Sequence, residues 1–146
     1  MRELGGEVRR AFRPMPGGTN FSYVPESDAT QLVTISGHPP EGELLSSIAH
    51  LLSDPGVLPR HPRILCDNRA LRIVVSTPFI DEVLKLAQHH IDRLAGGRVA
   101  LVAASTANFG MQRMFSMRAD DLPFEVRAFH EIVEARDWLV PSSAVP

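Results

Sequence analysis

The sequence predicts an α/β fold with a mostly parallel, mixed sheet of five strands and about four helices in the order ββαβαβαβα. Three observations predict it. From residue 30 onward, short apolar runs alternate with amphipathic stretches. Turn or cap residues separate these stretches. A chain of 146 residues with 44% hydrophobic and 22% charged residues also suits a single globular domain.

The first half of the chain begins with two β-rich runs, 21–24 and 30–36, which flank the turn-forming residues Pro25–Asp28. We expect these runs to pair as a hairpin with the first strand at or near an edge. An apolar stripe of helical period then predicts a helix over 41–52. The run Ile64-Leu65-Cys66 predicts a strand that stops at Asp67, with a loop from Asn68 to Val75.

A long amphipathic helix is expected after this loop. Ser76 or Thr77 supplies a hydroxyl that can cap free N–H groups, and Pro78 suits the first turn. Apolar residues at steps of three and four define one helix face; they are Ile80, Leu84, Ala87, Ile91 and Leu94. The pair Gly96-Gly97 ends the helix.

The remaining elements continue the alternation. We expect a buried strand over 98–104, a helix over 109–118, an outer strand over 124–129 and a last helix over 131–140. Residues 21–140 therefore form the predicted domain. Residues 1–20 are rich in Arg, Gly and Pro and predict a flexible N-terminal tail, and residues 141–146 predict a C-terminal tail.

Composition argues against several classes of function. A net charge of -2 gives no reason to expect a nucleic-acid partner, and one cysteine permits no disulfide within the chain. No run reaches the roughly 20 apolar residues that span a membrane, so we expect no stable membrane insertion. Residues 1–20 lack the apolar core of a secretory signal. The six histidines form no metal motif, and we expect a cytoplasmic protein without a cofactor.

The order of elements and the Asp67–Ser76 segment resemble the anti-sigma-factor-antagonist (STAS, or SpoIIAA-like) superfamily. In that family a strand ends in Asp, and a Ser or Thr that can be phosphorylated starts the next helix; here Ser76 follows Asp67 by nine residues. The segments 109–115 and 134–139 look more like its divergent, mostly uncharacterised branch. The resemblance implies a non-enzymatic regulatory or protein-interaction module. The fold of that branch has been compared with lipid-binding modules, which implies a lipid or small-ligand role as the alternative.

Five candidate binding or regulatory residues lie around the predicted start of the long helix: Asp67, Arg69, Arg72, Ser76 and Thr77. A phosphate on Ser76, or a bound anion, would meet the positive helix end and the forks of Arg69 and Arg72. The simpler alternative is that Ser76 only caps the helix, Asp67 closes a strand and the arginines are solvated.

The other candidates are Asn108, Phe109 and Met114, at the start of the next helix. Positions 111, 114, 115 and 118 share a helical face and predict a buried stripe. Phe109 does not fit that stripe and could face a partner or a pocket. These residues leave open a protein partner, a small anionic or lipid-like ligand, a homodimer, and an unrecognised enzyme with Ser76 as nucleophile. An exposed apolar surface around Phe109 and Met114 would favour a protein partner. An enclosed pocket of roughly 300–1,000 Å³ would favour a ligand.

Overall fold

Five strands form one sheet in a computed structural model that describes residues 20–26, 30–54 and 56–140. The strands are β1 (Phe21–Pro25), β2 (Thr30–Gly37), β3 (Arg63–Leu71), β4 (Arg98–Val102) and β5 (Glu125–Phe129). Their order in the sheet is their order in the chain; β1 pairs antiparallel with β2, and the other pairs are parallel. The predicted α/β class and element order are confirmed. Both predicted tails, residues 27–28 of the predicted turn and Pro55 lie outside the described residues, apart from Asn20.

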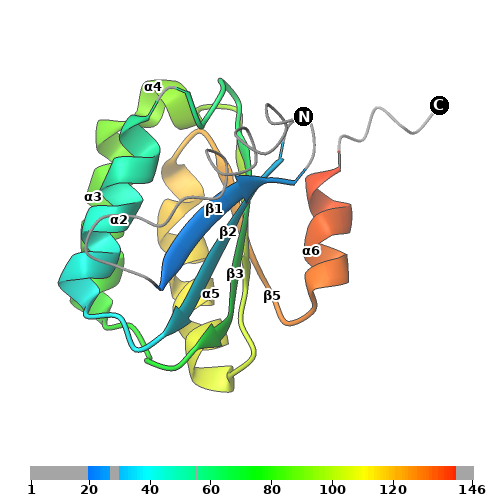
Figure 1. Cartoon of the computed structure of the whole chain (residues 1–146). Coiled ribbons are helices and arrows are strands. Elements are labelled where there is room, and N and C mark those ends of the chain that lie inside the picture. Colours follow the sequence, from blue (N-terminus) through cyan, green and yellow to red (C-terminus); the bar gives the residue numbers. More distant parts are fainter. Residues whose placement is uncertain (1–19, 27–29, 55, 141–146) are drawn as a thin grey trace, which may run out of the picture.

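The helices cover the two faces of the sheet unequally (Figure 1). They are α2 (Glu41–Ser53), α3 (Thr77–His89), α4 (Ile91–Leu94), α5 (Thr106–Arg118), the 3₁₀ turn η1 (Ala119–Asp121) and α6 (Ile132–Leu139). Helices α2 to α5 lie on one face and α6 lies on the other. Crossovers between parallel strands are almost always right-handed, so strands added successively in one direction send their connecting helices to the same face.

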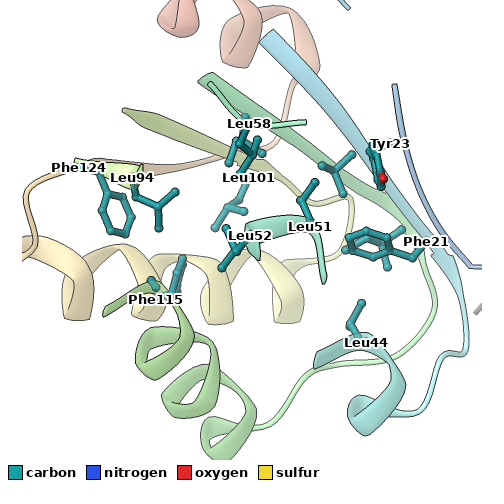
Figure 2. Packing of buried hydrophobic residues seen from close by; sticks show 14 of the residues in the cluster. Phe21, Tyr23, Leu44, Leu51, Leu52, Leu58, Leu94, Leu101, Phe115 and Phe124 are labelled. Atoms are coloured by element: carbon teal, nitrogen blue, oxygen red, sulfur yellow. The ribbon is translucent and has the colours of Figure 1, made fainter. Parts of the chain in front are cut away.

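Side chains of the strands alternate between two apolar cores. In β3, Ile64 belongs to the larger core. This core fills the space between the sheet and helices α2 to α5 and includes Phe21, Leu44 and Phe115 (Figure 2). The next residue, Leu65, points to the smaller core beneath α6. Leu65 is fully buried, as expected of a central strand covered on both faces.

Several element boundaries differ from the sequence prediction; β4, for example, ends at Val102 and not at residue 104. The long helix breaks at His90, whose backbone has φ -110° and ψ 28°, so α3 is followed by the single turn α4. The described chain therefore has five α-helices where about four were expected. The turn of α4 brings Arg93 to the carbonyl oxygen of Leu58, to which its guanidinium donates at 3.0 Å.

Strand β3 does not stop at Asp67 but continues to Leu71. The cause lies in its neighbour, because β2 extends to Gly37 and pairs Ser36 with Ala70 and Gly37 with Leu71. Between the Thr34–Asp67 pair and the Ser36–Ala70 pair, β3 has one residue more than β2, which is a β-bulge. Pairing across the sheet thus prevails over the turn preference of Asn68.

Candidate functional site

The carboxyl ends of the parallel strands meet at one edge of the sheet, which is the lower edge in Figure 1. Helices α2, α3, α5 and α6 all begin there, each following the strand before it. Helix starts carry unpaired N–H groups and partial positive charge. In open α/β sheets ligands bind at this edge, and all eight residues expected to form a site belong to segments that reach it.

Ser76 is the N-cap of α3, as its residue type predicts. Its Oγ accepts a hydrogen bond from the N–H of Phe79 at 3.3 Å. The same Oγ donates to Oε1 of Glu41 at 2.8 Å, and the N–H of Ser76 donates to Oε2 of Glu41 at 2.8 Å. Thr77 is the first helical residue and is exposed. The carboxylate of Glu41, from the start of α2, therefore joins two helix starts.

Glu41 completes a capping box that the local sequence lacks. In the usual motif a Glu three residues after the capping Ser accepts the N–H of that Ser, but here the position is Phe79. Glu41 takes this role from 35 residues away. No local pattern could have assigned it. Its carboxylate also holds the position at the start of α3 where an anion was expected.

Asp67 and Arg69 pair with each other, but on the opposite face of the sheet from Ser76. Asp67 lies two residues after Leu65 in β3 and therefore shares its face, which packs beneath α6, whereas Phe79 of α3 packs in the larger core. The Arg69 guanidinium donates to both oxygens of Asp67 at 2.8 and 2.9 Å, and the N–H of Arg69 donates at 3.1 Å. These bonds, with the guanidinium charge, lower the pKa of the Asp67 carboxyl.

Arg72 lies on the connection between β3 and α3 and is exposed. Its backbone N–H donates to the carbonyl oxygen of Gly37 at 2.7 Å, which fixes the end of β3 against β2. The convergence of Arg69 and Arg72 on Ser76 that would favour an anion site is not seen, because Arg69 is bonded to Asp67 on the other face.

The buried stripe of α5 differs from the predicted one. Asn108, Gln112 and Phe115 face the core, with Ala119 in the turn that follows, whereas Met114 is half-buried and Arg118 is exposed. The helix begins at Thr106, with Ser105 as N-cap, three residues earlier than expected. Phe109 is half-buried and stacks on His130 with ring centroids 3.8 Å apart. The apolar surface expected around Phe109 and Met114 is thus partly covered within the chain.

Sequence reasoning missed a row of polar side chains inside the larger core. The Cys66 thiol donates to Oδ1 of Asn68 at 3.3 Å, and Nδ2 of Asn68 donates to Oε1 of Gln112 at 3.0 Å. Nε2 of Gln112 then donates to the carbonyl oxygen of Leu101 at 3.2 Å. Burial raises the pKa of Cys66 to about 12, so the thiol keeps its proton. The sequence feature that could have revealed this row is the four-residue spacing of Asn108 and Gln112, which places both amides on one face of a helix.

The opposite edge of the sheet holds a polar hollow of about 730 Å³. Arg63 and Arg98, the first residues of β3 and β4, are among the residues that line it. Each donates at 2.7 Å to a carbonyl at the end of α6, Arg63 to Leu139 and Arg98 to Trp138. This is where the negative end of a helix attracts cations. Both arginines therefore serve to hold α6.

No group of three or more acidic, histidine or cysteine residues within the described ranges is arranged to hold a metal ion. Among the same residues, no helix is both long and apolar enough to cross a membrane. Comparisons of the chain with protein-family models, curated proteins and solved structures find no match.

Proposed function

We propose that this chain is a non-enzymatic regulatory or protein-interaction module of the STAS-like kind, with Ser76 as its switch point. The proposal is supported by the α/β element order and by the position of Ser76 at the start of α3. Asp67, the other residue of the family pattern, lies on the opposite face and within β3. Ser76 therefore carries the proposal alone.

The observation that carries it is the joint between Ser76 and Glu41. One hydroxyl takes part in the cap of α3 and in the contact with α2. A phosphate on that hydroxyl adds a charge of about -1.5 to -2. The added charge would stand beside the Glu41 carboxylate and repel it. Phosphorylation would therefore separate the starts of α2 and α3, and so change the surface offered to a partner.

The same geometry favours a role without catalysis. The Ser76 hydroxyl and the Glu41 carboxylate are as close to each other as a catalytic nucleophile and its general base would be. Glu41, however, also accepts the N–H of Ser76, so a negative charge occupies the helix start where a developing oxyanion would need N–H donors. A hydrolytic reaction at Ser76 would have to displace this carboxylate.

Ser105 provides a matched control, because it caps α5 through the N–H of Asn108 at 3.1 Å and is exposed. Asp is itself a good N-cap, so Ser105→Asp should leave the denaturation midpoint nearly unchanged. Ser76→Asp should lower the midpoint, and Glu41→Gln should reverse most of that loss. Equal effects of the two Asp variants would show that the joint has no special role.

The switch itself is tested on tagged chain purified from its own host. The intact mass should show a phosphate that maps to Ser76 and is absent from Ser76→Ala. A host protein should co-purify with only one of the wild-type and Ser76→Asp chains. A chain without phosphate, together with identical co-purifying proteins for both forms, would overturn the proposal.

A further inference from the structure

Two adjoining cavities lie in the larger core, between the sheet and helices α2, α3 and α5. Their volumes are about 100 and 110 Å³. The side chains that line both are Ile35, Ile48, Cys66, Val83, Leu101 and Phe115. Protein interiors have few voids larger than a water molecule. A core that keeps two neighbouring voids leaves room for another molecule.

One wall of one of the two cavities contains three amide side chains, although almost all of the surface that this cavity exposes is apolar. Its lining includes the side chains of Asn68, Asn108 and Gln112, whereas the lining of the other is apolar apart from Cys66. Asn108 and Gln112 are only 5% and 7% exposed. Burying an amide is unfavourable unless its polar atoms are bonded, so each amide of this wall needs a partner for both its oxygen and its nitrogen.

Asn108 holds the one amide oxygen of this wall that has no donor in the described part of the chain. Its Nδ2 donates to the carbonyl oxygen of Ile73 at 2.8 Å. Because a carbonyl only accepts, this bond fixes the nitrogen toward Ile73 and leaves Oδ1 for another donor. Asn68 and Gln112, in contrast, use both their amide atoms in the row that ends at Leu101.

The lining also selects the charge of a ligand. None of the side chains that line the two cavities is ionised, since the Cys66 thiol keeps its proton. An ionised group would lose its hydration without gaining a counter-charge. An apolar cavity of about 150 Å³ in another protein is known to hold benzene. The volumes here suit a ligand of similar size.

We propose that the two cavities form one binding site for a small neutral molecule with an apolar body and a single hydroxyl or N–H donor. The donor bonds Oδ1 of Asn108, and the apolar body fills the space between Val83 and Leu101. The site differs from the anion site expected at the start of α3. The proposal goes beyond the regulatory role and does not depend on it.

The test is a titration of the full chain with three probes, followed by amide NMR and by thermal melts. Phenol should bind best, raise the melting temperature and shift the amide signals of residues around Asn108. Toluene, which lacks a donor, should bind more weakly, and benzoate should not bind at this site. Absence of phenol binding, or binding of benzoate as strong as that of phenol, would overturn the proposal.

Two variants locate the site. Asn108→Leu should weaken phenol binding about five- to tenfold, the value of one hydrogen bond, and leave toluene binding unchanged. Val83→Phe fills the space that both cavities share and should abolish binding of both probes. If Val83→Phe does not fold, Asn108→Leu still decides: an equal loss for phenol and toluene would contradict the role of the Asn108 oxygen.

Discussion

Ser76 and Ser105 show how much a single residue's role depends on its neighbours. Both hydroxyls accept an N–H three residues ahead, as a serine at a helix start predicts. Only Ser76 also donates to a carboxylate from another helix. The cap is a local property and could be predicted from sequence. The partner Glu41 could not, because the contact depends on how α2 and α3 pack.

Asp67 should make stability depend on pH. Its bonds to Arg69 lower its pKa in the folded chain below the unfolded value of about 3.9. A group of this kind stabilises the fold fully above its unfolded pKa, and the contribution disappears as pH falls through its folded pKa. Denaturant melts should therefore show a difference between wild type and Asp67→Asn that is largest near neutral pH and shrinks below pH of about 4.

Arg69→Leu is the control for this pair. It removes the group that chiefly lowers the pKa of Asp67, so it should give the same pH dependence as Asp67→Asn. Combining the two substitutions should add little further. A difference between wild type and Asp67→Asn that stays constant down to acid pH would contradict the assigned role.

For the helices and strands, the type of each segment could be predicted from the period of its hydrophobic residues. The ends of each segment, however, depend on the elements that pair with it or pack against it. β3 extends beyond its predicted end because β2 pairs with it as far as Leu71. α5 began early because the exposed Ser105 caps it. Its buried face was misjudged because hydrophobicity marked Met111 and Met114, whereas the core accepts the amides of Asn108 and Gln112.

Two glycines, one within α5 and one just before β4, should respond oppositely to substitution by alanine. Gly110 lies within α5, and a methyl group there would meet nothing within 4 Å. Gly110→Ala should raise the free energy of unfolding by about 0.5–1 kcal/mol, because it removes backbone freedom from the unfolded chain. Gly97, just before β4, would place its methyl group 2.5 Å from the carbonyl oxygen of Pro62.

Gly97→Ala should therefore lower the free energy of unfolding by about 1–3 kcal/mol, as forced packing does. Denaturant melts of both variants check the pair. A neutral Gly97→Ala would mean that the junction of Pro62 and Gly97 yields easily. A destabilising Gly110→Ala would mean that α5 needs flexibility at that turn.

For the whole molecule, the α/β class, the hairpin and the edge positions of β1 and β5 followed from the sequence alone. The alternation of strand-like and helix-like hydrophobic periods, with the short connections, is enough to predict these features, because neighbouring parallel strands need a crossover helix. The sequence could not reveal that Ser76 and Asp67 lie on opposite faces. Their separation arises because Asp67 faces α6 within β3, whereas α3, which Ser76 caps, packs on the other face of the sheet, and it divides the predicted site.

The attachment of α6 can be followed through Trp138, the single tryptophan of the chain. The Arg98 guanidinium lies 5.2 Å from the centre of the Trp138 ring and donates a hydrogen bond to the carbonyl oxygen of Trp138. Arg98→Met should shift tryptophan emission to the red and lower the free energy of unfolding by about 1–2 kcal/mol. Arg127→Met is the control, since among the described residues Arg127 bonds no carbonyl of α6. Equal losses for both variants would contradict a specific role of Arg98.

The agreement between strand order and chain order has a consequence for synthesis. A chain emerging from the ribosome can add each strand to the edge left by the one before, because no later strand must insert between earlier ones. β4 then remains an unpaired edge of the nascent sheet until residue 129, the end of β5, has emerged. Through that interval Leu65, Ala100 and Val102 lack the cover of α6. Exposed apolar strands of this kind invite aggregation, so the last 20 or so residues of the domain decide how safely it folds in the cell.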